Sequence, residues 1–575
     1  MYAISQKARK GLLRRDASMT YTTKFTARDH KDFCATFRID APDTFNFAFD
    51  VLDPIAAADP ARLCIAHVDD AGVRRDYTFA WMAEASAKLA NALRLQGIRK
   101  GDRVMLVLYR RIEFWVSMLA LHRLGAVAIP APAQLTPKDI VFRVERARTR
   151  CVIVDHSITD RVEAARPDCP GLAVCVQVGG DALPRGWVDY DTIFTPAEAR
   201  FPRPESPLEF AGGEDPLLIF FSSGTTGMPK MVEHVHTYPL GHLLTGMYWH
   251  DLVPGDLHLT LADTGWGKAV WGKFYGQWMA GASVFVYDFR GKFEPAALLQ
   301  VLADHAVTTF CAPPTVYRFL VRQDLSAYDL SKLRHCTTAG ELLNDSVFHD
   351  WKAATGLELH EGYGQTETTL QIATLPCMAP KAGSIGRPMP GWDVVLQDAA
   401  GNICPPGEEG EICVRVAEGL PVGLFRGYLE EPEKTASVMF GGYYHTGDKA
   451  WMDEDGYYWF LGRVDDLIKS SGYRIGPFEV ESALVAHPAV VEAAVTGVPD
   501  PLRGQAVKAT VVLAGGYTAS DALTKELQDH VKKVTAPYKY PRIIDYVVEL
   551  PKTISGKIKR AEIRERDQQA GEPGA

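Results

Sequence analysis

The stretch Leu217–Lys230 reads LLIFFSSGTTGMPK, an apolar run followed by a loop rich in glycine and hydroxyl residues that ends in a lysine. The apolar run Leu217–Phe221 predicts a buried strand. Glycines let a loop turn its backbone N–H groups toward an anion, hydroxyls add donors, and the lysine supplies positive charge. The sequence therefore predicts a phosphate-binding loop, with a flexible surface turn as the alternative, made of Ser222, Ser223, Gly224, Thr225, Thr226, Gly227, Met228, Pro229 and Lys230.

This loop lacks the Walker A pattern, in which a Gly-Lys pair is followed by the Ser or Thr that binds magnesium. No Gly-Lys pair in the chain has such a neighbour. The chain also contains no Gly-x-Ser-x-Gly elbow and no His-Glu-x-x-His pair. The sequence thus gives no support to a P-loop kinase or GTPase, a serine hydrolase or a zinc protease.

The composition is that of a globular chain able to bury several cores, with 575 residues, 47% hydrophobic and 23% charged. The formal net charge of -9 gives no electrostatic reason to bind nucleic acid. Ten cysteines occur without a Cys-x-x-C pair or metal-ligand spacing, which favours reduced, packed thiols. No apolar run reaches the roughly eighteen residues of a membrane helix. We therefore expect a soluble protein whose partners are small molecules, with no nucleic-acid partner, no integral membrane segment and oligomerisation left open.

Five cations precede Met19, against the single acid Asp16. An extended basic tail, residues 1–30, is the favoured interpretation, and a transit segment is the alternative. The first interpretation places the protein in the cytoplasm and the second in the mitochondrial matrix. No apolar core follows the cations, which excludes a secretory signal.

Helical and strand patterns alternate through the first part of the chain. In order they predict a helix with Met82, Ala85, Leu89 and Leu93 on one face, a strand Val104–Leu108, a helix Ile112–Leu124, a strand Ala126–Pro130, a helix Pro137–Arg148 and a strand Cys151–Asp155. Repeated βαβ units imply a mainly parallel sheet covered by helices. The prolines Pro202, Pro204 and Pro207 mark a linker before the phosphate loop, so we expect at least two lobes in a large domain, residues 31–464.

A separate α+β module, residues 465–575, is predicted at the other end of the chain. Pro477 stands where a helix can begin, and a second helix is predicted over Asp521–Val534. The segments Val491–Val498 and Ala506–Leu513 alternate as strands do.

Four more motifs follow the loop: HEGYGQTE (His360–Glu367), HTGD (His445–Asp448), GRVDDLIK (Gly462–Lys469) and PKTISGK (Pro551–Lys557). In this order they resemble the adenylate-forming enzymes, over nearly the full length of the chain. SGYRIGPFEVE (Ser471–Glu481) and YKYPR (Tyr538–Arg542) resemble the medium-chain acyl-CoA synthetase group in particular. The resemblance implies an α/β fold, with a large multi-lobed N-terminal domain of mainly parallel sheets and helices and a small mobile α+β C-terminal domain.

The resemblance also implies an AMP-forming ligase that uses ATP, Mg2+ and coenzyme A. A carboxylate attacks the α-phosphate of ATP to give an acyl-adenylate and pyrophosphate, and the thiol of coenzyme A then displaces AMP. Such chemistry asks the protein mainly to position the reactants and to neutralise developing charge. A hydroxyl-lined loop, a carboxylate that binds magnesium and a lysine suit this task.

By resemblance, Tyr363 stacks on adenine, Thr366 binds the α-phosphate, Glu367 holds magnesium and Asp448 accepts from the ribose hydroxyls. Each has a structural alternative, such as core packing for Tyr363, a helix start for Glu367 and a turn for Asp448. The resemblance completes the ATP-binding set with Gly340, Glu341, Glu361, Gly362, Gly364, Gln365, Arg463 and Lys557.

Lys557 matches the catalytic lysine of the family, which bridges the incoming carboxylate and the α-phosphate. The alternative is that it belongs to a solvated basic tail. Because this lysine would obstruct coenzyme A in the second step, the resemblance implies that the small domain turns on a hinge at Asp465. The residues expected to contact coenzyme A are Ser471, Gly472, Tyr473, Arg503, Lys532, Tyr540, Pro541 and Arg542. For the cations among them, the alternative is that they are surface side chains that contact only solvent.

The acyl site is expected beside Gly364, where acetate-activating relatives carry a tryptophan. Removing an indole leaves room for several methylenes of about 0.8 kcal/mol each, so four favour a longer acid by roughly 3 kcal/mol. We therefore expect medium-chain fatty acids, with aromatic acids as a further class, and little reaction with acetate. Lys268 introduces a cation that favours a polar or dicarboxylic acid if it points inward. The acyl site also includes Gln134, Arg474 and Trp266, the last being equally compatible with core packing.

Two other functions remain open at this point. A carrier-loading or adenylate-retaining enzyme would share the fold, but the motif at Ser471–Glu481 and the C-terminal cations favour free coenzyme A. A catalytically silent nucleotide sensor is the second alternative. Retention of Glu367, Asp448 and Lys557 argues against it.

Overall fold

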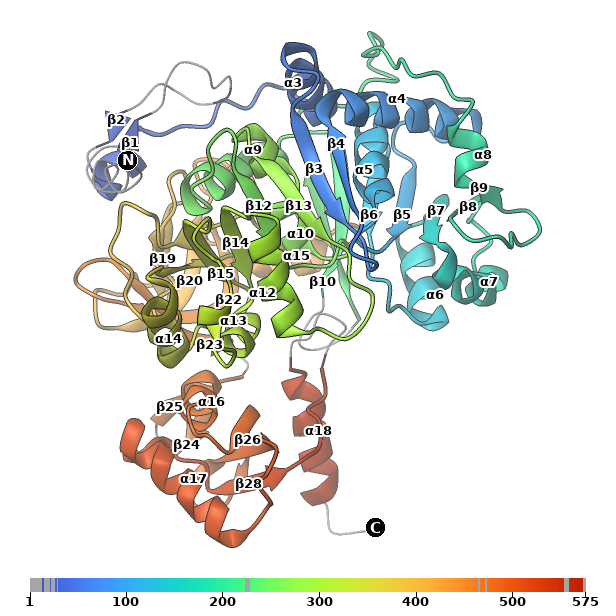
Figure 1. Ribbon diagram of the computed structural model, residues 1–575. Helices are drawn as coiled ribbons and strands as arrows, with labels where there is room; N and C mark the ends of the chain where they lie inside the picture. The colour runs from blue at the N-terminus through green and yellow to red at the C-terminus, as the bar shows by residue number, and fades with distance from the viewer. Residues whose placement is uncertain are drawn as a thin grey trace.

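The computed structural model describes residues 13–14, 21, 26–27, 29–222, 228–463, 466–470, 473–552 and 558–571. In Figure 1 a large domain, coloured blue to orange, lies above a small red domain formed by the C-terminal part of the chain. The predicted basic tail lies largely outside the described residues. Near it, the short strands β1 and β2 pair with each other, and they are followed by two helices, α2 and α3: Leu13–Arg14, Thr26–Ala27, His30–Thr36 and Asp53–Ala58.

The first sheet of the large domain contains the βαβ units that the sequence predicts. Its strand order is β11-β10-β6-β5-β7-β8-β9, and every pair except β10 with β11 is parallel. These strands are Lys230–Val235, Pro216–Ser222, Val127–Pro130, Arg103–Val107, Cys151–Asp155, Val174–Val178 and Val188–Asp189. The helices of this part of the chain are α4 to α8: Phe79–Leu95, Ile112–Leu124, Pro137–Arg146, Thr159–Ala165 and Tyr190–Phe194.

Helix α5 shows how local sequence sets this region. All its residues from Phe114 to Leu124 are buried, as expected for a helix enclosed by packed layers. It ends at Gly125, whose φ of 66° is a left-handed conformation that glycine adopts without a steric cost. The buried Arg123 is satisfied by the carboxylate of Asp53, 2.9 Å from its Nη1. The predicted helix Ile112–Leu124 is confirmed at both ends.

The second sheet has nine strands in the order β18-β17-β16-β15-β14-β12-β13-β3-β4. Its central strands, from β16 to β3, run parallel. The strands are Arg387–Pro388, Ile372–Ala373, Leu359–Tyr363, His335–Ala339, Thr309–Ala312, Leu257–Thr260, Ser283–Tyr287, Leu63–Val68 and Arg74–Thr78. The accompanying helices, α9 to α14, are Tyr238–Leu244, Gly267–Gly272, Tyr275–Met279, Pro295–Asp304, Pro314–Leu320 and Asp345–Thr355.

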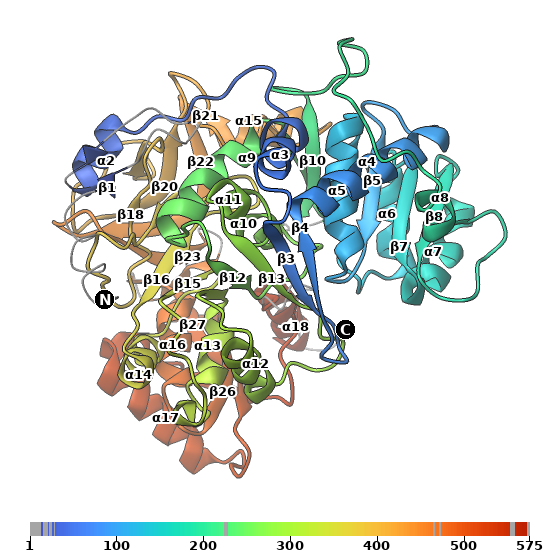
Figure 2. The same ribbon diagram turned by 45° about the horizontal axis from the view of Figure 1, so that its top comes forward.

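A third, antiparallel sheet completes the large domain. Its order is β19-β20-β22-β21, and β23 also pairs with β22. The strands are Val394–Gln397, Glu409–Arg415, Tyr443–Met452, Met439–Phe440 and Tyr458–Arg463, with helix α15 at Pro432–Val438. The expectation of at least two lobes is met by three sheets, which Figure 2 shows from a second direction.

The small domain is the predicted α+β module. Its sheet has the order β25-β24-β27-β26, with β28 paired to β27. The apolar residues Leu523, Leu527 and Val531 of helix α17 are buried against it. The strands are Tyr473–Ile475, Ile468–Ser470, Gly504–Leu513, Val490–Asp500 and Ile543–Tyr546, and the helices α16 to α18 are Pro477–Val485, Asp521–Val534 and Arg560–Gly571.

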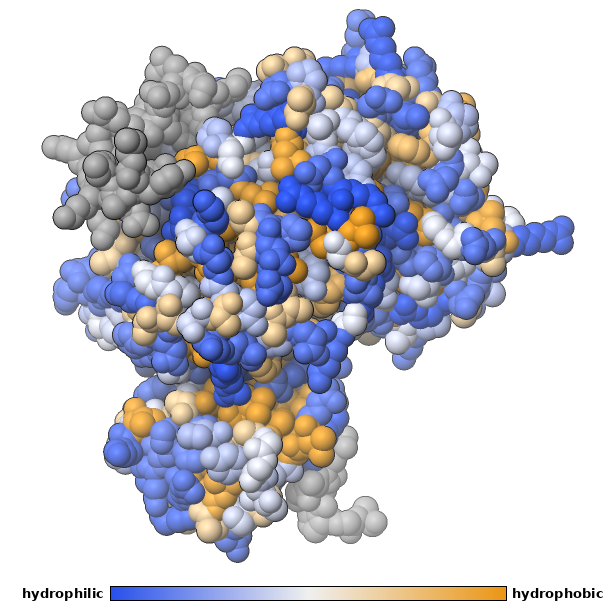
Figure 3. Space-filling model, in the orientation of Figure 1, coloured by the Kyte–Doolittle hydropathy of each residue, from blue (hydrophilic) through white to orange (hydrophobic). Residues whose placement is uncertain are grey.

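The two domains meet where the chain passes from β23 to β24. Gly476 lies so close to the large domain that a Cβ atom there would come within 2.4 Å of the Leu461 carbonyl oxygen. Ser482 and Asn344 form a hydrogen bond across the junction. On the face shown in Figure 3, hydrophobic residues gather on the small domain next to this junction.

Two further expectations concern the thiols and the membrane. Eight of the ten cysteines are buried, as packed thiols should be. Among the described residues, no helix combines the length and the hydropathy needed to cross a lipid bilayer.

Candidate active site

The candidate site lies where the carboxyl ends of parallel strands from two sheets meet. Strands β6 and β10 end at Pro130 and Ser222, and strands β15 and β16 end at Ala339 and Tyr363. The two edges are close, because a Cβ atom on Gly265 would lie 2.3 Å from the backbone nitrogen of Pro132. Open α/β sheets bind ligands at such carboxyl edges.

The predicted phosphate loop connects β10 to β11 at this edge. Its residues Ser223, Gly224, Thr225, Thr226 and Gly227 lie outside the described residues. Ser222 ends β10, Lys230 begins β11, and the two are paired in the antiparallel register. Met228 is exposed beside them and Pro229 is half-buried. The strand before the loop is therefore confirmed, and the binding of phosphate stays a prediction.

A buried carboxylate, Asp448, organises the side of the site that the sequence assigns to the nucleoside. Its Oδ2 accepts from the hydroxyl of Tyr363 and from Nε2 of Gln365, each at 2.6 Å. Its Oδ1 lies 3.3 Å from Nη1 of Arg463. Tyr444 fixes Gln365 by donating to its Oε1 at 2.6 Å. The structure thus brings together four predicted ATP residues, from β16 and the segment that follows it, from β22 and from β23.

Electrostatics keep the hydroxyl of Tyr363 protonated. Burial, followed by the carboxylate of Asp448, raises the pKa of Tyr363 well above its usual value. Tyr363 therefore remains a donor. Asp448 is only 4% exposed, so a charged group there depends on these donors and on Arg463.

The Gln-Thr-Glu segment is held by contacts from three directions. Nε2 of His234 donates to the carbonyl oxygen of Thr366 at 2.8 Å, and burial lowers the pKa of this histidine to about 4. The hydroxyl of Tyr428 donates to Oε1 of Glu367 at 2.9 Å. The ammonium of Lys230 lies 4.7 Å from the centre of the Tyr428 ring. Glu367 and Lys230 therefore both lie close to Tyr428, beside the ends of the predicted phosphate loop.

These surroundings fit a hard divalent cation at Glu367. Mg2+ prefers oxygen ligands and keeps several waters, so it needs only one or two protein carboxylates. The Tyr428 bond orients the half-buried carboxylate of Glu367 through Oε1.

The remaining predicted ATP residues either can offer only backbone groups to a nucleotide or have side chains buried below the site. Gly340 has a φ of 97°, which only glycine adopts readily. Glu341 accepts from the hydroxyl of Thr315 at 2.5 Å. The side chain of Glu361 is buried, which raises its pKa well above the usual value, and a Cβ atom on Gly362 would lie 2.7 Å from the ring of Trp249. Glu361 and Gly362 thus offer a nucleotide their backbone only.

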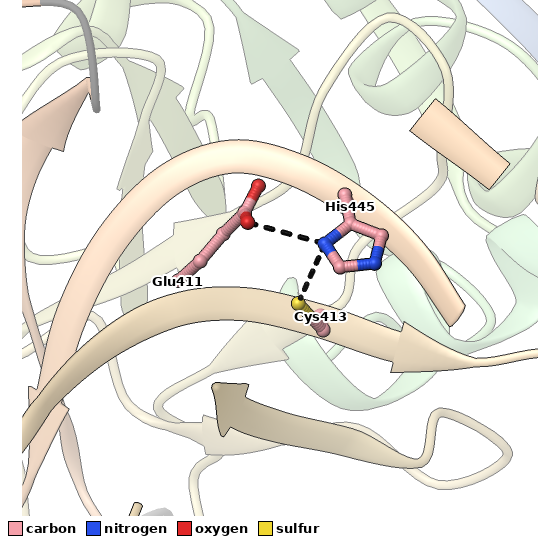
Figure 4. A group of neighbouring side chains, drawn as sticks. All are labelled: Glu411, Cys413 and His445. Atoms are coloured by element: carbon pink, nitrogen blue, oxygen red, sulfur yellow. Dashed lines mark hydrogen bonds and ion pairs between the residues drawn. The ribbon is translucent and has the colours of Figure 1, made fainter. Parts of the chain in front are cut away.

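A cluster that the sequence did not reveal supports the turn before Asp448. Glu411 and Cys413 on β20 lie beside His445 on β22, as Figure 4 shows. Oε2 of Glu411 accepts from Nδ1 of His445 at 3.1 Å, and Oε1 accepts from the backbone N–H of Gly447 at 2.8 Å. Sγ of Cys413 lies 3.4 Å from the same Nδ1.

The ligand atoms of this cluster lie within 4.8 Å of one another, a spacing that a thiophilic metal could use. Such a metal requires the thiolate, whereas burial, followed by the Glu411 carboxylate, raises the pKa of Cys413 far above its usual value. We therefore interpret the cluster as a hydrogen-bonded support of the HTGD turn. Strand pairing brings it together across 34 residues of sequence, which explains why spacing gave no signal.

Three of the expected acyl residues, Gln134, Trp266 and Gly364, lie on the same edge of the large domain. Trp266 is half-buried at the start of α10, and Gln134 is exposed. Beside Gly364, where the sequence predicts room for the acid, the indole of Trp271 packs closely. Its Cη2 lies 2.4 Å from an ideal Cβ on Gly364. Lys268 points toward the carboxyl end of β15, where its ammonium donates to the Ala339 carbonyl at 2.6 Å.

On the small domain, the structure gathers the aromatic and cationic residues assigned to coenzyme A into two groups. Tyr473 stacks on Tyr538 with ring centres 4.0 Å apart. Lys532 and Arg542 lie 4.2 and 4.7 Å from the ring centre of Tyr540. Of the other residues assigned to coenzyme A, Pro541 lies between Tyr540 and Arg542, and the N–H of Arg503 donates to Asp500. Arg474, which was assigned to the acyl site, belongs to β25 of the small domain. The predicted residues Asp465, Ser471, Gly472 and Lys557 lie outside the described residues.

The segments on either side of Lys557 are nevertheless anchored beside the large domain. Lys552 and Ile558 form a β-bridge, and Lys552 donates to Glu492 at 2.7 Å. Burial lowers the pKa of Arg318 on α13, and the carboxylates of Glu341 and Glu492 act in the opposite direction. Arg318 thus lies near Glu341, which is predicted to lie beside adenine, and near Glu492, which binds Lys552.

Comparisons with known proteins agree with this geometry. Residues 54–429 match the family described as AMP-binding enzyme, and residues 479–557 match the family described as AMP-binding enzyme C-terminal domain. The mitochondrial acyl-coenzyme A synthetase ACSM5 of Homo sapiens is 44% identical over 535 residues, which cover 92% of this chain and 91% of that protein. The mitochondrial acyl-coenzyme A synthetase ACSM3 of Homo sapiens is 42% identical over 540 residues, with 92% and 91% covered.

Solved structures give the same result. The anthranilate CoA ligase AuaEII in complex with anthranoyl-AMP aligns with a TM-score of 0.84 and 31% identity, over 92% of this chain and 98% of that chain. The predicted α/β fold with a large and a small domain is confirmed. Acyl-CoA synthetases of this superfamily use ATP, coenzyme A and Mg2+, so these expected cofactors are confirmed as well. The chain belongs to the medium-chain family of acyl-CoA synthetases and is an ATP-dependent ligase that makes coenzyme A thioesters through acyl-adenylates.

Proposed function

We propose that this ligase activates medium-chain or aromatic carboxylic acids, with nucleotide contacts at the carboxyl edge of the large domain and Lys557 as its catalytic lysine. The observation that carries the proposal is the convergence of the Asp448 network, the Glu367 carboxylate and the Lys557 anchors on one edge. The domain division at residues 464 and 465 belongs to the proposal. It is supported by the change from the third sheet, which ends with β23 at Arg463, to the small-domain sheet, which begins with β24 at Ile468.

Asp448 accepts hydrogen bonds from the ribose hydroxyls in this proposal. The carboxylate is already oriented by Tyr363 and Gln365, so little freedom is lost when a ribose binds. Tyr363 presents its ring to adenine, beside the backbone of Gly340 and Glu341. Arg463 balances the charge of the buried carboxylate.

The phosphates bind between the loop after β10 and the Gln-Thr-Glu segment. Thr366 binds the α-phosphate, and the loop with Lys230 holds the β- and γ-phosphates. Glu367 would hold Mg2+, which supplies positive charge to the phosphate oxygens. Pyrophosphate is then the leaving group when the carboxylate oxygen bonds to the α-phosphorus.

Lys557 neutralises the charge that accumulates between the carboxylate and the α-phosphate. The anchors Lys552 and Ile558 hold the ends of its segment near Glu492, which faces Arg318. In the second step the small domain turns about Asp465, Lys557 withdraws, and Ser471, Gly472 and Tyr473 line the path of the thiol. Lys532, Tyr540 and Arg542 bind the phosphates or the adenine of coenzyme A.

The acid is drawn from the medium-chain and aromatic classes, and acetate reacts poorly. AuaEII is named an anthranilate CoA ligase, and anthranilate is an aromatic acid, which supports the second class. Dicarboxylic acids are a further candidate, because the ammonium of Lys268 lies at the end of β15 beside Gly340.

The similar synthetases ACSM3 and ACSM5 of Homo sapiens are named as mitochondrial enzymes. This supports the interpretation of the basic N-terminal residues as a transit segment and a location in the mitochondrial matrix. The cytoplasmic alternative has no comparable support.

Separate assays of the two half-reactions test the proposal. Lys557→Ala should slow ATP–pyrophosphate exchange at least a hundredfold, since a comparable charge-stabilising donor is worth about 3 kcal/mol. It should retain thioester formation from supplied acyl-adenylate. Lys559→Ala is the matched control, because Lys559 is exposed and pairs with Glu562. Equal loss of both half-reactions in Lys557→Ala would refute the assigned role.

A further inference from the structure

A chain of hydrogen bonds connects Tyr444 to Asp448 through the amide of Gln365. The hydroxyl of Tyr444 donates to Oε1 of Gln365 at 2.6 Å. On the other side of the amide, Nε2 donates to Oδ2 of Asp448 at 2.6 Å and to the Thr446 carbonyl oxygen at 2.9 Å. Turning the amide over would place Oε1 against the carboxylate and the carbonyl oxygen, so its three partners select one orientation.

Tyr444 is held firmly at the start of this chain. It lies on β22 and pairs with Val414 of β20 on one side and Met439 of β21 on the other. Its side chain is 2% exposed, and its ring lies 5.5 Å from that of Phe425. Burial, followed by the carboxylate of Glu367, raises the pKa of Tyr444 well above its usual value. The hydroxyl therefore stays protonated and remains a donor.

The chain determines how the Asp448 carboxylate is presented. Gln365 and Tyr363 both donate to Oδ2, which leaves Oδ1, 3.3 Å from Arg463, as the less occupied oxygen. A carboxylate that is already oriented loses little freedom when a ligand hydroxyl donates to it. Without the hydroxyl of Tyr444, Oε1 of Gln365 would be a buried acceptor lacking this partner, and the amide would no longer be fixed from that side.

A second tyrosine shows that this hydroxyl has a distinct task. The hydroxyl of Tyr428 donates to Glu367, at the end of the Gln-Thr-Glu segment that is assigned to Mg2+. The hydroxyl of Tyr444 donates to Gln365, at the end that faces Asp448. The two tyrosines thus hold opposite ends of the same short segment.

We propose that Tyr444 is a positioning residue that acts through Gln365 and sets how strongly the enzyme discriminates ribonucleotides from deoxyribonucleotides. This inference rests on the proposed contact between Asp448 and the ribose hydroxyls. Tyr444 makes no contact of its own with the nucleotide. It holds the amide that holds the carboxylate.

The variant Tyr444→Phe removes the hydroxyl and keeps the ring. ATP–pyrophosphate exchange is measured with ATP, 2′-deoxy-ATP and 3′-deoxy-ATP at one saturating acid. A neutral hydrogen bond is typically worth about a two- to tenfold change in affinity. We expect the KM for ATP to rise by that factor with little change in kcat, and the discrimination against at least one deoxynucleotide to fall by about the same factor. Calorimetric binding of AMP and its two deoxy analogues gives the same ratios without turnover.

A double-mutant cycle with Gln365→Met tests the route. If Tyr444 acts through Gln365, adding Tyr444→Phe to Gln365→Met changes the ratios no further. Independent, additive effects would overturn the inference. Tyr443→Phe is the matched control and should keep the wild-type ratios, because Tyr443 is the adjacent tyrosine of β22 and its side chain lies on the opposite face. If Tyr444→Phe does not fold, unchanged ratios in Gln365→Met would still overturn the inference.

The outcomes separate this inference from the proposed function. Wild-type discrimination in Tyr444→Phe, together with lost discrimination in Asp448→Asn, would overturn the role of Tyr444 and leave the ribose contact intact. Wild-type discrimination in Asp448→Asn would overturn the ribose contact itself. An altered Mg2+ dependence of Tyr444→Phe with unchanged ratios would assign the hydroxyl to Glu367 and also overturn the inference. Discrimination that falls in Tyr444→Phe but not in Tyr443→Phe supports it.

Discussion

Replacing Asp448 by asparagine removes one negative charge from the centre of the proposed ribose site. The carboxylate accepts two hydrogen bonds through Oδ2, from Tyr363 and Gln365, and faces Arg463 through Oδ1. Asparagine keeps the shape but turns one acceptor into a donor. One of the three donors around it therefore loses its partner.

The structure allows the loss to be estimated. A ribose hydroxyl that donates to a carboxylate contributes about 1.5 to 3 kcal/mol, compared with about 1 kcal/mol for a neutral acceptor. For two hydroxyls the difference amounts to about 1 to 4 kcal/mol, or roughly 5- to 800-fold in affinity. The ion pair with Arg463 adds little, since the side chain of Arg463 is 38% exposed and screened by solvent.

The assay is ATP–pyrophosphate exchange at saturating acid, with ATP varied, together with calorimetric binding of ATP. We expect a rise in the KM and the Kd for ATP of that size and a smaller change in kcat. Asp455→Asn is the control, because Asp455 is exposed in the turn between β22 and β23. A folded Asp448→Asn enzyme with the wild-type KM for ATP would refute the reasoning.

Two more substitutions test other parts of the structure. Glu411→Gln weakens the support of the HTGD turn and should raise the KM for ATP about five- to tenfold, through the loss of about 1 to 1.4 kcal/mol. Glu409→Gln is the control and should leave this KM unchanged, because Glu409 is exposed on the same strand. Equal kinetics of the two variants would contradict the support role. Lys273→Met removes a buried ammonium that, among the described residues, has no hydrogen-bond partner and whose pKa is lowered to about 7, chiefly by burial and then by Arg110. In the unfolded chain this lysine has its ordinary pKa of 10.5, so between pH 7 and 10.5 the unfolded state binds a proton that the folded state does not. The unfolding free energy of wild type should therefore fall as the pH falls from about 10 to about 7 and then level off. In urea titrations, Lys273→Met should lack this slope. The same slope in the variant would show that Lys273 does not cause it.

Elements with a strong local pattern could be predicted from the sequence. Helix α5 begins and ends where its apolar residues and Gly125 require, and α17 spans the predicted Asp521–Val534 with Ser520 as its cap. The five ordered motifs were enough to place the chain in its family, and four residues of the predicted nucleotide site do converge. Short-range periodicity and turn chemistry determine the two helices, so they can be recognised without knowledge of tertiary contacts. The family and the nucleotide residues were recognised through the resemblance of the ordered motifs.

Contacts between distant segments could not be predicted in this way. Strand β3 pairs with β13, more than two hundred residues later, because the second sheet accepts a strand from the start of the chain. The Glu411 cluster depends on the register of β20 against β22. The sequence shows the missing side chain at Gly364 but not the indole of Trp271, which packs against that glycine from another element. Spacing along a chain contains no information about such encounters.

The most direct test of the account is to measure AMP, pyrophosphate and thioester together after mixing the purified protein with ATP, Mg2+, coenzyme A and each of several medium-chain and aromatic acids. The account predicts that the three products form in equal amounts with at least one medium-chain or aromatic acid, and that omission of coenzyme A leaves enzyme-bound acyl-adenylate and pyrophosphate. ADP in place of AMP, or no product with any acid, would contradict it.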